Sequence, residues 1–405
     1  MTRLRMSAGM RTGLLLLLAV ILFYWKITLT GQFSLLTEPE GVNQQYSWLQ
    51  YWTNGIRHLS IPLWDPYAWA GRSFPGEMQT GAFYPPHLLL AAMPRGRDSL
   101  LALSSYHVYI VFVHFLGVCF MFALVRELGL GRLAASVAGL CFSLGGFVSR
   151  MSWPHMLESA IWLPLIFLFF LRAMREETTR RAVAAAACGG LMLGLSILAG
   201  GLHLVILQGL ALVSAGVYYA FVRRPSRHRV AFTVAIVCGV GLCAGAVQLL
   251  PSFEYSAQAL RFLGPVGGLP ANQKIPYDYL SDGLFPFGFV MMLIPQAFGG
   301  RFGNGEVTNP YLGVFPLFLA LVGIWRNWGN LWVRYLAGLA LAAFLYSLGS
   351  LSPLHGLLYA LVPKLWIARE AGRAVYLLDF SFGESGAVRA GTPADSWRSS
   401  GPISI

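Results

Sequence analysis

The sequence has few charged residues, and this scarcity excludes a soluble globular fold. Charged side chains make up 11% of the 405 residues and hydrophobic ones 56%, whereas about 25% of the residues in ordinary soluble domains are charged. The apolar residues form blocks of about 16 to 22, the length that a helix needs to cross the hydrocarbon core of a bilayer. Runs such as 14–23 also lack the alternation of transmembrane β-strands. The sequence therefore predicts an all-α polytopic membrane protein.

Acidic residues and lysines are scarce as well, so arginine carries nearly all of the net charge of +12. In a soluble protein this charge would suggest a nucleic-acid partner. In an inner-membrane protein, positive residues instead collect in the cytoplasmic loops. We therefore expect membrane lipid, and no nucleic acid, among the partners.

Paired cysteines are also missing. The five cysteines all lie inside apolar runs, without the paired spacing in a polar segment that marks a disulfide framework or a metal cluster. They are Cys119, Cys141, Cys188, Cys238 and Cys243. We interpret them as small packing residues.

The hydropathy pattern predicts about nine transmembrane helices. They are expected at 13–30, 106–125, 133–149, 157–171, 183–199, 203–222, 231–250, 311–325 and 331–349. The first follows a basic N-terminus, as in a signal peptide, but no small-residue cleavage site follows it and it is long enough to span. A shorter apolar stretch at 284–298 contains two prolines and is expected to be re-entrant or interfacial.

The charges of the connecting segments predict the orientation. Alternate connections are rich in arginine, which places them and the N-terminus in the cytoplasm. These arginines are Arg3, Arg5, Arg11, Arg126, Arg132, the four within 172–181, those of 223–229, Arg326 and Arg334. The other side receives two large outer loops, 31–105 and 251–310, which carry most of the acidic residues.

The composition changes abruptly near residue 383. We expect residues 1–382 to form one transmembrane domain, and the Gly-, Ser- and Pro-rich segment 383–405 to be a disordered or aberrant tail. The apolar run before it, 374–382, is too short to cross a bilayer. This pattern indicates a truncated or frame-shifted chain.

The first outer loop contains the strongest candidate for a catalytic site. Glu38 and Glu40 flank a proline directly after the first predicted helix. In an extended chain, residues i and i+2 point to the same side, so the two carboxylates could converge. Such a pair suits a general base or a divalent cation such as Mg²⁺ or Mn²⁺. Alternatively, both glutamates are simply solvated, and no other cofactor or metal is indicated.

A short amphipathic helix is expected next. Trp48, Trp52, Ile56 and Leu59 recur at helical spacing, with polar residues between them. Tryptophans on such a helix suit the headgroup zone of the membrane. The helix is therefore expected to lie on the outer surface, either as an interfacial anchor or beside a lipid substrate.

Four segments resemble the bacterial YfhO-like membrane protein family. IPLWDPYAWAGRSFPGEMQTGAFYPPHLLL (61–90) resembles its PLWNPY…Q-x-G-x-FYP signature, and AVQLLPSFEYSAQALR (246–261) its QLLP-x-x-E segment. NPYLGVFPLFLALVG (309–323) is similar to its Y-x-G-x-x-P-L helix start, and LVPKLWIAREAGRAVYLLDFSF (361–382) to its Arg-x-x-x-Arg stretch. The four occur in the family's order, and the resemblance extends along the chain from about residue 30 to 382.

The resemblance implies a glycosyltransferase of the C superfamily. Such enzymes take a sugar from a polyprenyl-phosphate donor on the outer face of the bacterial cytoplasmic membrane, with inversion. The acceptor would be an envelope glycan or glycoprotein. The general base would be Glu40, with Glu38 as alternate or partner, although the family usually has an aspartate there. The first-loop signature would comprise Gln45, Tyr46, Trp64, Asp65, Tyr67, Gln79 and Tyr84.

Several basic side chains suit the phosphate of such a donor. Arg369 and Arg373 are four residues apart, so on a helix they would share a face and could bind a phosphate together. Arg150 and His155 lie in a short predicted outer turn. All four have an alternative interpretation as residues that reach the lipid headgroups. His203 stands where the family often has Gly-His-Pro-Gln, a pattern that this sequence lacks.

Two other functions remain open at this point. A transporter or flippase of lipid-linked glycans would share the many helices and the arginines, but it would more often show broken helices and mid-membrane charges. An inactive truncated fragment is the third possibility. The concentration of polar residues in the first outer loop favours the transferase.

Overall fold

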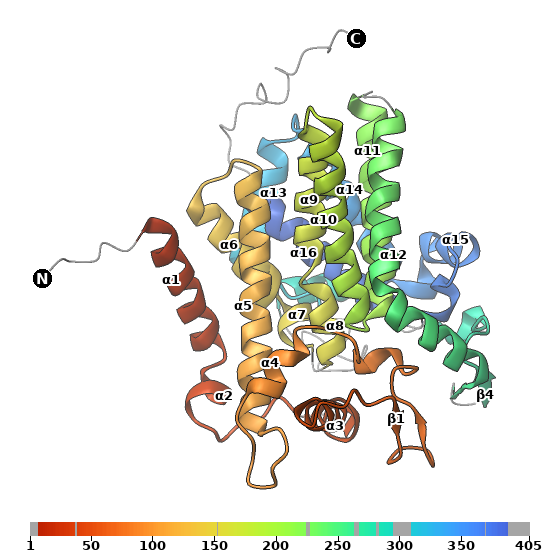
Figure 1. Ribbon diagram of the computed structural model, residues 1–405. Helices are drawn as coiled ribbons and strands as arrows, with labels where there is room; N and C mark the ends of the chain where they lie inside the picture. Colours follow the sequence, from red (N-terminus) through yellow and green to blue (C-terminus); the bar gives the residue numbers. More distant parts are fainter. Residues whose placement is uncertain are drawn as a thin grey trace, which may run out of the picture.

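The computed structural model describes residues 7–36, 39–151, 153–223, 227–262, 267–280, 283–294, 309–368 and 370–387. Its helices form an upright bundle, with smaller elements gathered at one end (Figure 1). The protein is a polytopic all-α membrane protein, as its composition predicted, because five described helices are long and apolar enough to cross a membrane. Four shorter apolar helices complete a set of nine in the described part of the chain.

Each apolar helix coincides with a predicted span. The long ones are α5 (Leu103–Glu127), α10 (Thr179–Leu198), α11 (Leu202–Arg223), α12 (Arg227–Gln258), and α8 (Pro154–Ala160), which continues as α9 (Leu163–Arg175). The shorter ones are α1 (Ala8–Phe23), α6 (Arg132–Leu144), α13 (Val314–Arg326) and α14 (Leu331–Ser347).

Two of the short helices are short because the predicted span is interrupted. α1 ends before Tyr24 and the chain continues as α2 (Trp25–Leu29). α6 ends at Gly145, whose ψ of 161° is extended, and the one-turn helix α7 (Gly146–Ser149) follows. The N–H of Gly146 donates to the carbonyl of Tyr311, at 2.6 Å, instead of continuing α6.

Small residues let α10 and α12 pack closely. A Cβ atom on Gly190 would lie 2.6 Å from Cβ of Val240, and one on Gly194 would lie 2.6 Å from Cβ of Ala244. Backbones that approach this closely gain van der Waals contact, which drives helix association in membranes. The C-terminal end of α12 extends from this packed pair to the second long segment.

The helix α16 (Val375–Ala387) lies inside the bundle, against α6, α13 and α14. Its first turns are fully buried, including Tyr376, Asp379 and Phe380. Although the apolar run was judged too short to span, Tyr376 and Phe380 form part of the main hydrophobic core. The helix continues past Phe382, where the tail was predicted to begin, and residues 388–405 lie outside the described part.

The two long segments predicted to be outer loops, here called the first and second outer segments, meet at one end of the bundle, as the labels α3, β1 and β4 show in Figure 1. The first contains a π-helix (Gly41–Tyr46), α3 (Ser47–Arg57), the antiparallel hairpin β1 (Trp64–Asp65) and β2 (Arg72–Ser73), a 3-10 turn (Met78–Thr80) and α4 (His87–Ala92). The second contains the antiparallel pair β3 (Leu260–Phe262) and β4 (Gly268–Pro270) and 3-10 turns at Tyr277–Tyr279 and Pro286–Met292.

The remaining elements follow α14. They are a 3-10 turn (Gly349–Leu351), α15 (Pro353–Leu361) and two further 3-10 turns (Leu365–Ile367 and Ala371–Ala374). The predicted re-entrant stretch is the 3-10 turn Pro286–Met292 in its described part, and residues 295–298 lie outside that part. At seven residues, this turn is far shorter than a span.

The amphipathic helix α3 forms as predicted, but it ends at Arg57, so that Leu59 of the predicted apolar face lies beyond it and is 98% exposed. The tryptophans of α3 do not face lipid. Trp48 and Trp52 are buried against Phe74 and Ala82 of the same outer segment. The indole N–H of Trp52 donates to the carbonyl of Ala82 at 2.7 Å. The apolar face of α3 is therefore covered by protein, because the chain folds back over it after the hairpin.

Candidate functional site

A cavity of about 670 Å³ opens between the outer segments and the ends of the helices. Its walls come from the β1–β2 hairpin and the residues after it, the starts of α8 and α11, and the C-terminal end of α12. Lys364, Ala368 and Arg373 complete them. Segments far apart in the sequence thus converge here. A volume of this size suits a ligand rather than water alone.

The cavity is strongly basic. Four cationic side chains line it, Arg72, Arg261, Lys364 and Arg373, together with His155 and His203. Among the described residues that line it, Glu77 is the only carboxylate. A cavity with this excess of positive charge favours an anionic ligand.

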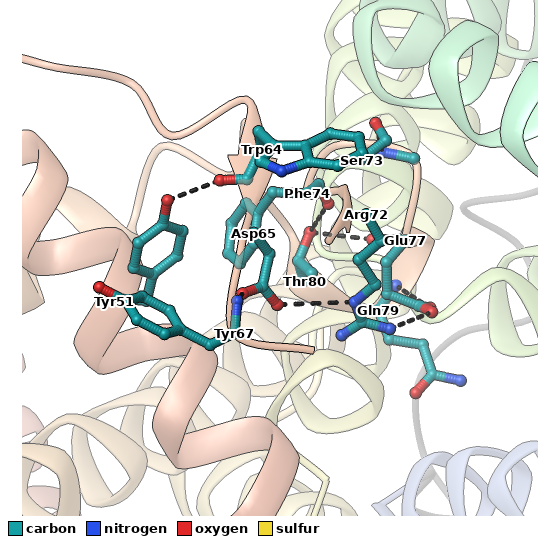
Figure 2. A network of polar contacts seen from close by, with 11 residues as sticks. Tyr51, Trp64, Asp65, Tyr67, Arg72, Ser73, Phe74, Glu77, Gln79 and Thr80 are labelled. Carbon is teal, nitrogen blue, oxygen red and sulfur yellow. Dashed lines mark hydrogen bonds and ion pairs between the residues drawn. The ribbon is translucent and has the colours of Figure 1, made fainter. Parts of the chain in front are cut away.

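Arg72 lies between two carboxylates (Figure 2). Its Nε is 3.6 Å from Oδ2 of Asp65, and its Nη1 is 3.4 Å from Oε2 of Glu77. Asp65 is opposite Arg72 in the hairpin register, which explains their contact. The guanidinium also stacks over the ring of Trp48, 4.8 Å from its centroid. These contacts hold Arg72 in one position.

Glu77 precedes the 3-10 turn Met78–Thr80 and accepts a hydrogen bond from the N–H of Gln79 at 3.4 Å. Burial raises the pKa of its carboxyl above the usual 4.5, while the charge of Arg72 and the bond from Gln79 act in the opposite direction. A carboxylate whose pKa is raised towards neutrality accepts a proton more readily.

Arg373 and the buried His203 form a further part of the cavity wall, here called the deep wall. Nη1 of Arg373 is 3.5 Å from Nδ1 of His203, and the guanidinium lies 5.1 Å from the ring centroid of Trp153. Because an arginine can only donate, Nδ1 must accept and the imidazole proton is on Nε2. That buried Nε2 has no hydrogen-bond partner within the described residues. It is therefore a donor suited to a ligand oxygen.

Burial also affects Arg373 itself. Desolvation lowers its pKa to about 10, with Glu370 acting against this shift and Arg261 adding to it. The group stays protonated at neutral pH. A partly desolvated guanidinium binds an anion more strongly than a hydrated one does.

His155 connects the cavity to the first outer segment. Its Nδ1 is 3.3 Å from the acceptor Oε1 of Gln45, and both side chains are buried. His155 also stacks on Trp153, with ring centroids 6.0 Å apart. The sequence predicted Gln45 and His155 for different roles, and the fold brings them together.

The predicted carboxylate pair is placed differently. Glu40 is exposed, helical (φ −64°, ψ −36°), and is not among the residues that line the cavity. Pro39 is helical as well, in keeping with the suitability of proline for the first turn of a helix. Glu38 lies outside the described residues.

Of the three arginines predicted to bind phosphate, only one is found at the cavity in the described part of the chain. Arg373 lines the cavity, whereas Arg369 lies outside the described residues. No continuous helix joins them, because Ala368 and Glu370 are not helical and the 3-10 turn begins at Ala371. Arg150 is exposed at the end of α7 and does not line the cavity.

The other residues of the first-loop signature mostly support the fold. The Tyr46 hydroxyl donates to the Leu101 carbonyl at 2.6 Å, and the buried Tyr84 hydroxyl accepts from the indole N–H of Trp162 at 3.1 Å. Trp64 and Tyr67 are exposed on the hairpin, and only Gln79 of the signature lines the cavity.

Sequence reasoning missed Arg72, Glu77, Arg261 and Lys364 as site residues. Arg72 and Glu77 lie within the quoted segment 61–90, so their charges in a motif-like stretch were the available signal. Arg261 and Lys364 had no local signal, because the tertiary fold alone brings them to the cavity.

A metal site for the predicted divalent cation is not apparent within the described residues. No group of three or more His, Cys, Asp or Glu side chains there could hold a metal ion. All five cysteines are free. With Glu38 outside the described part, the cation at the carboxylate pair stays a prediction.

Comparisons with known proteins give one structural neighbour. No protein-family model and no curated protein matches the chain. Among solved structures, the crystal structure of ArnT from Cupriavidus metallidurans bound to undecaprenyl phosphate is similar, with a TM-score of 0.42 and 15% sequence identity. The match covers 93% of this chain and 76% of that one.

Proposed function

We propose that this protein is a membrane glycosyltransferase of the C superfamily that transfers a sugar from a polyprenyl-phosphate donor. The observation that carries the proposal is the basic cavity at the outer end of the bundle, with one carboxylate, Glu77, beside the cations. The four sequence segments that resemble the YfhO-like family support it independently.

The donor phosphate would bind to the deep wall of the cavity. The half-buried Arg373 and the buried Nε2–H of His203 are donors there, and Arg261 and Lys364 add positive charge. Guanidinium groups bind phosphate oxygens through strong charge-assisted hydrogen bonds. As the sugar leaves, the same groups would stabilise the negative charge that develops on the polyprenyl phosphate.

The general base would be a carboxylate near this phosphate. It takes the proton of the acceptor hydroxyl as that oxygen attacks the anomeric carbon from the face opposite the phosphate, which inverts the configuration. We assign this role to Glu77, because it lines the cavity and its pKa is raised. Glu40, with Glu38, remains the alternative that the family resemblance suggests.

The reaction would take place on the outer face of the bacterial cytoplasmic membrane, with the N-terminus in the cytoplasm. The arginine-rich connections lie at the end of the bundle opposite α3, β1 and β4 (Figure 1), which supports this orientation through the positive-inside rule. The acceptor would be an envelope glycan or glycoprotein.

A lipid-linked glycan flippase is the second candidate, and one observation favours it. The break between α6 and α7 lies beside Asp379, since a Cβ on Gly145 would be 3.3 Å from its Oδ2. Asp379 is fully buried inside the bundle. Broken helices and intramembrane carboxylates are typical of transporters.

The two functions are separated in proteoliposomes. Radiolabelled polyprenyl-phosphate sugars are supplied together with envelope glycans or glycoproteins as acceptors. Two quantities are measured: the label transferred to the acceptor, and the movement of the lipid between the two leaflets. A transferase gives labelled acceptor that depends on Glu77 or Glu40. Lipid movement without transfer, abolished in Asp379→Asn, would support the flippase and contradict our proposal.

A further inference from the structure

The turn of the β1–β2 hairpin presents an aromatic side chain at the mouth of the cavity. Trp69 lines the cavity, yet 84% of the surface of this residue is exposed. Its neighbour Tyr67 is equally exposed but does not line the cavity. In the part of the chain that the structure describes, Trp69 therefore offers an exposed aromatic ring to a ligand in the cavity.

The backbone of this turn is held in an unfavourable conformation. Trp69 and Ala70 have φ of 55° and 60°, a left-handed region that residues with a side chain rarely adopt. Gly71 follows at φ 102°, and a Cβ there would lie 2.6 Å from the ring of Trp64. The ring of Trp64 thus packs on Gly71 and supports the turn. Such backbone strain persists where it positions a functional side chain.

The cavity beside Trp69 combines aromatic and uncharged polar groups. Phe253 and Tyr255 line it together with the amides of Gln79 and Asn272. Sugars present an apolar face of C–H bonds, which packs on an aromatic ring, and an edge of hydroxyls, which pairs with amides. This set of side chains therefore suits a pyranose ring.

A lipid surface fits the hairpin less well. Figure 1 shows the hairpin beyond the ends of α9 and α10, at the end of the molecule that carries the outer segments. The hairpin therefore lies outside the length of the bundle that α9 and α10 occupy. The same hairpin also carries Arg72 into the basic cavity, so it is continuous with the proposed donor site.

We propose that Trp69 forms the acceptor subsite, where a pyranose ring of a glycan acceptor stacks on its indole. The donor phosphate binds at the deep wall near Arg373, and Trp69 lies at the mouth, so the sugar on Trp69 is on the acceptor side. This inference rests on the proposed function and identifies the acceptor as a carbohydrate.

The test is saturation-transfer-difference NMR on the full chain in lipid nanodiscs. The probes are the methyl glycosides of glucose, galactose and N-acetylglucosamine, without any donor. The ring protons of at least one glycoside receive saturation from the wild type. In Trp69→Ala the binding weakens about two- to tenfold, the range expected for loss of one aromatic stack. Trp69→Phe retains part of it.

Tyr67→Ala is the matched control, because Tyr67 is an equally exposed aromatic residue on the same turn. It binds the glycosides like the wild type. Absence of any signal, or equal weakening in Tyr67→Ala and Trp69→Ala, would overturn the proposal. A fluorophore attached to the cysteine of Trp69→Cys tests the location of the turn. Quenching of this fluorophore by spin-labelled lipids would place the turn in the membrane and would also overturn the proposal.

A second experiment distinguishes an acceptor subsite at Trp69 from a donor-sugar subsite. The measurement is repeated in Glu77→Gln with the cavity saturated by a polyprenyl-phosphate hexose. An acceptor subsite still binds the glycoside, whereas loss of the signal would assign Trp69 to the donor sugar and contradict the inference. Because these experiments measure binding rather than transfer, a failed transferase assay leaves their outcome unaffected.

Discussion

Nε2 of His87 lies 3.0 Å from Oε1 of Glu158, and both side chains are buried. The hydroxyl of Tyr109 donates to the same oxygen at 2.5 Å. His87 begins α4 of the first outer segment, while Glu158 is one turn after His155 on α8. This contact therefore ties the outer segment to the helix that carries a cavity residue.

We predict that Glu158→Leu destabilises the protein. The substitution leaves the buried His87 and Tyr109 without their shared acceptor, and each unsatisfied group costs about 1–3 kcal/mol. Thermal unfolding in detergent, followed by a thiol-reactive dye, measures the loss. Glu127→Gln is the control, because Glu127 pairs with the half-exposed Arg172 and such pairs contribute about 0–1 kcal/mol. Equal effects of both substitutions would contradict the anchoring role.

The identity of the general base is tested by two isosteric substitutions. Glu77→Gln is expected to lower the transfer rate about 10²- to 10⁴-fold, the usual contribution of a positioned base. Glu40→Gln should retain most activity, because Glu40 is exposed and does not line the cavity. The opposite result would assign the base to Glu40, as the family resemblance implies. Insertion and unfolding temperature are compared in both variants.

The pH profile gives an independent test of Glu77. A base works only when deprotonated, so kcat/KM should fall as the pH drops through the raised pKa of Glu77, which lies above 4.5. Arg72 lowers that pKa, so Arg72→Met should move this acidic limb to higher pH as well as weaken binding. Arg150→Met, at an exposed site away from the cavity, should leave the limb in place. An unshifted limb in Arg72→Met would rule out Glu77.

The orientation is tested by cysteine labelling in a background without the five native cysteines. Single cysteines in place of Asp98 and Gln273, exposed in the two outer segments, should react with an impermeant maleimide in intact spheroplasts. A cysteine in place of Thr178, exposed between α9 and α10, should react only after lysis. The reverse pattern would refute the topology.

Close packing at the cavity wall predicts a further effect. Gly200 has φ of 97°, and a Cβ there would overlap the carbonyl oxygen of Met78 in the first outer segment. Gly200→Ala should therefore displace the segment that carries Glu77 and Gln79, and destabilise the protein by more than about 1 kcal/mol. Gly209→Ala, at a helical position with open space around the Cβ, is the matched control. Unchanged stability and activity in Gly200→Ala would show that the segment adapts.

The site residues were only partly predictable, for reasons that differ between them. His155, Arg373 and Gln79 were recognised because a polar residue in or near an apolar segment, or within a motif, stands out locally. Arg261 and Lys364 did not stand out, because basic residues in outer segments are common. The environment of Trp48 and Trp52 was also predicted wrongly, because an amphipathic pattern does not tell whether lipid or protein covers the apolar face.

The sequence by itself determined the positions of the nine apolar helices and the charge difference between the two sets of connecting segments. Both follow from local composition, because a bilayer demands long apolar helices and retains arginines on one side. Only the tertiary structure decided that Arg72, Glu77, His203 and Arg373 share one cavity, that α3 is covered by protein, and that the short α16 lies in the core. These depend on contacts between segments up to some 300 residues apart, which periodicity along the chain does not encode.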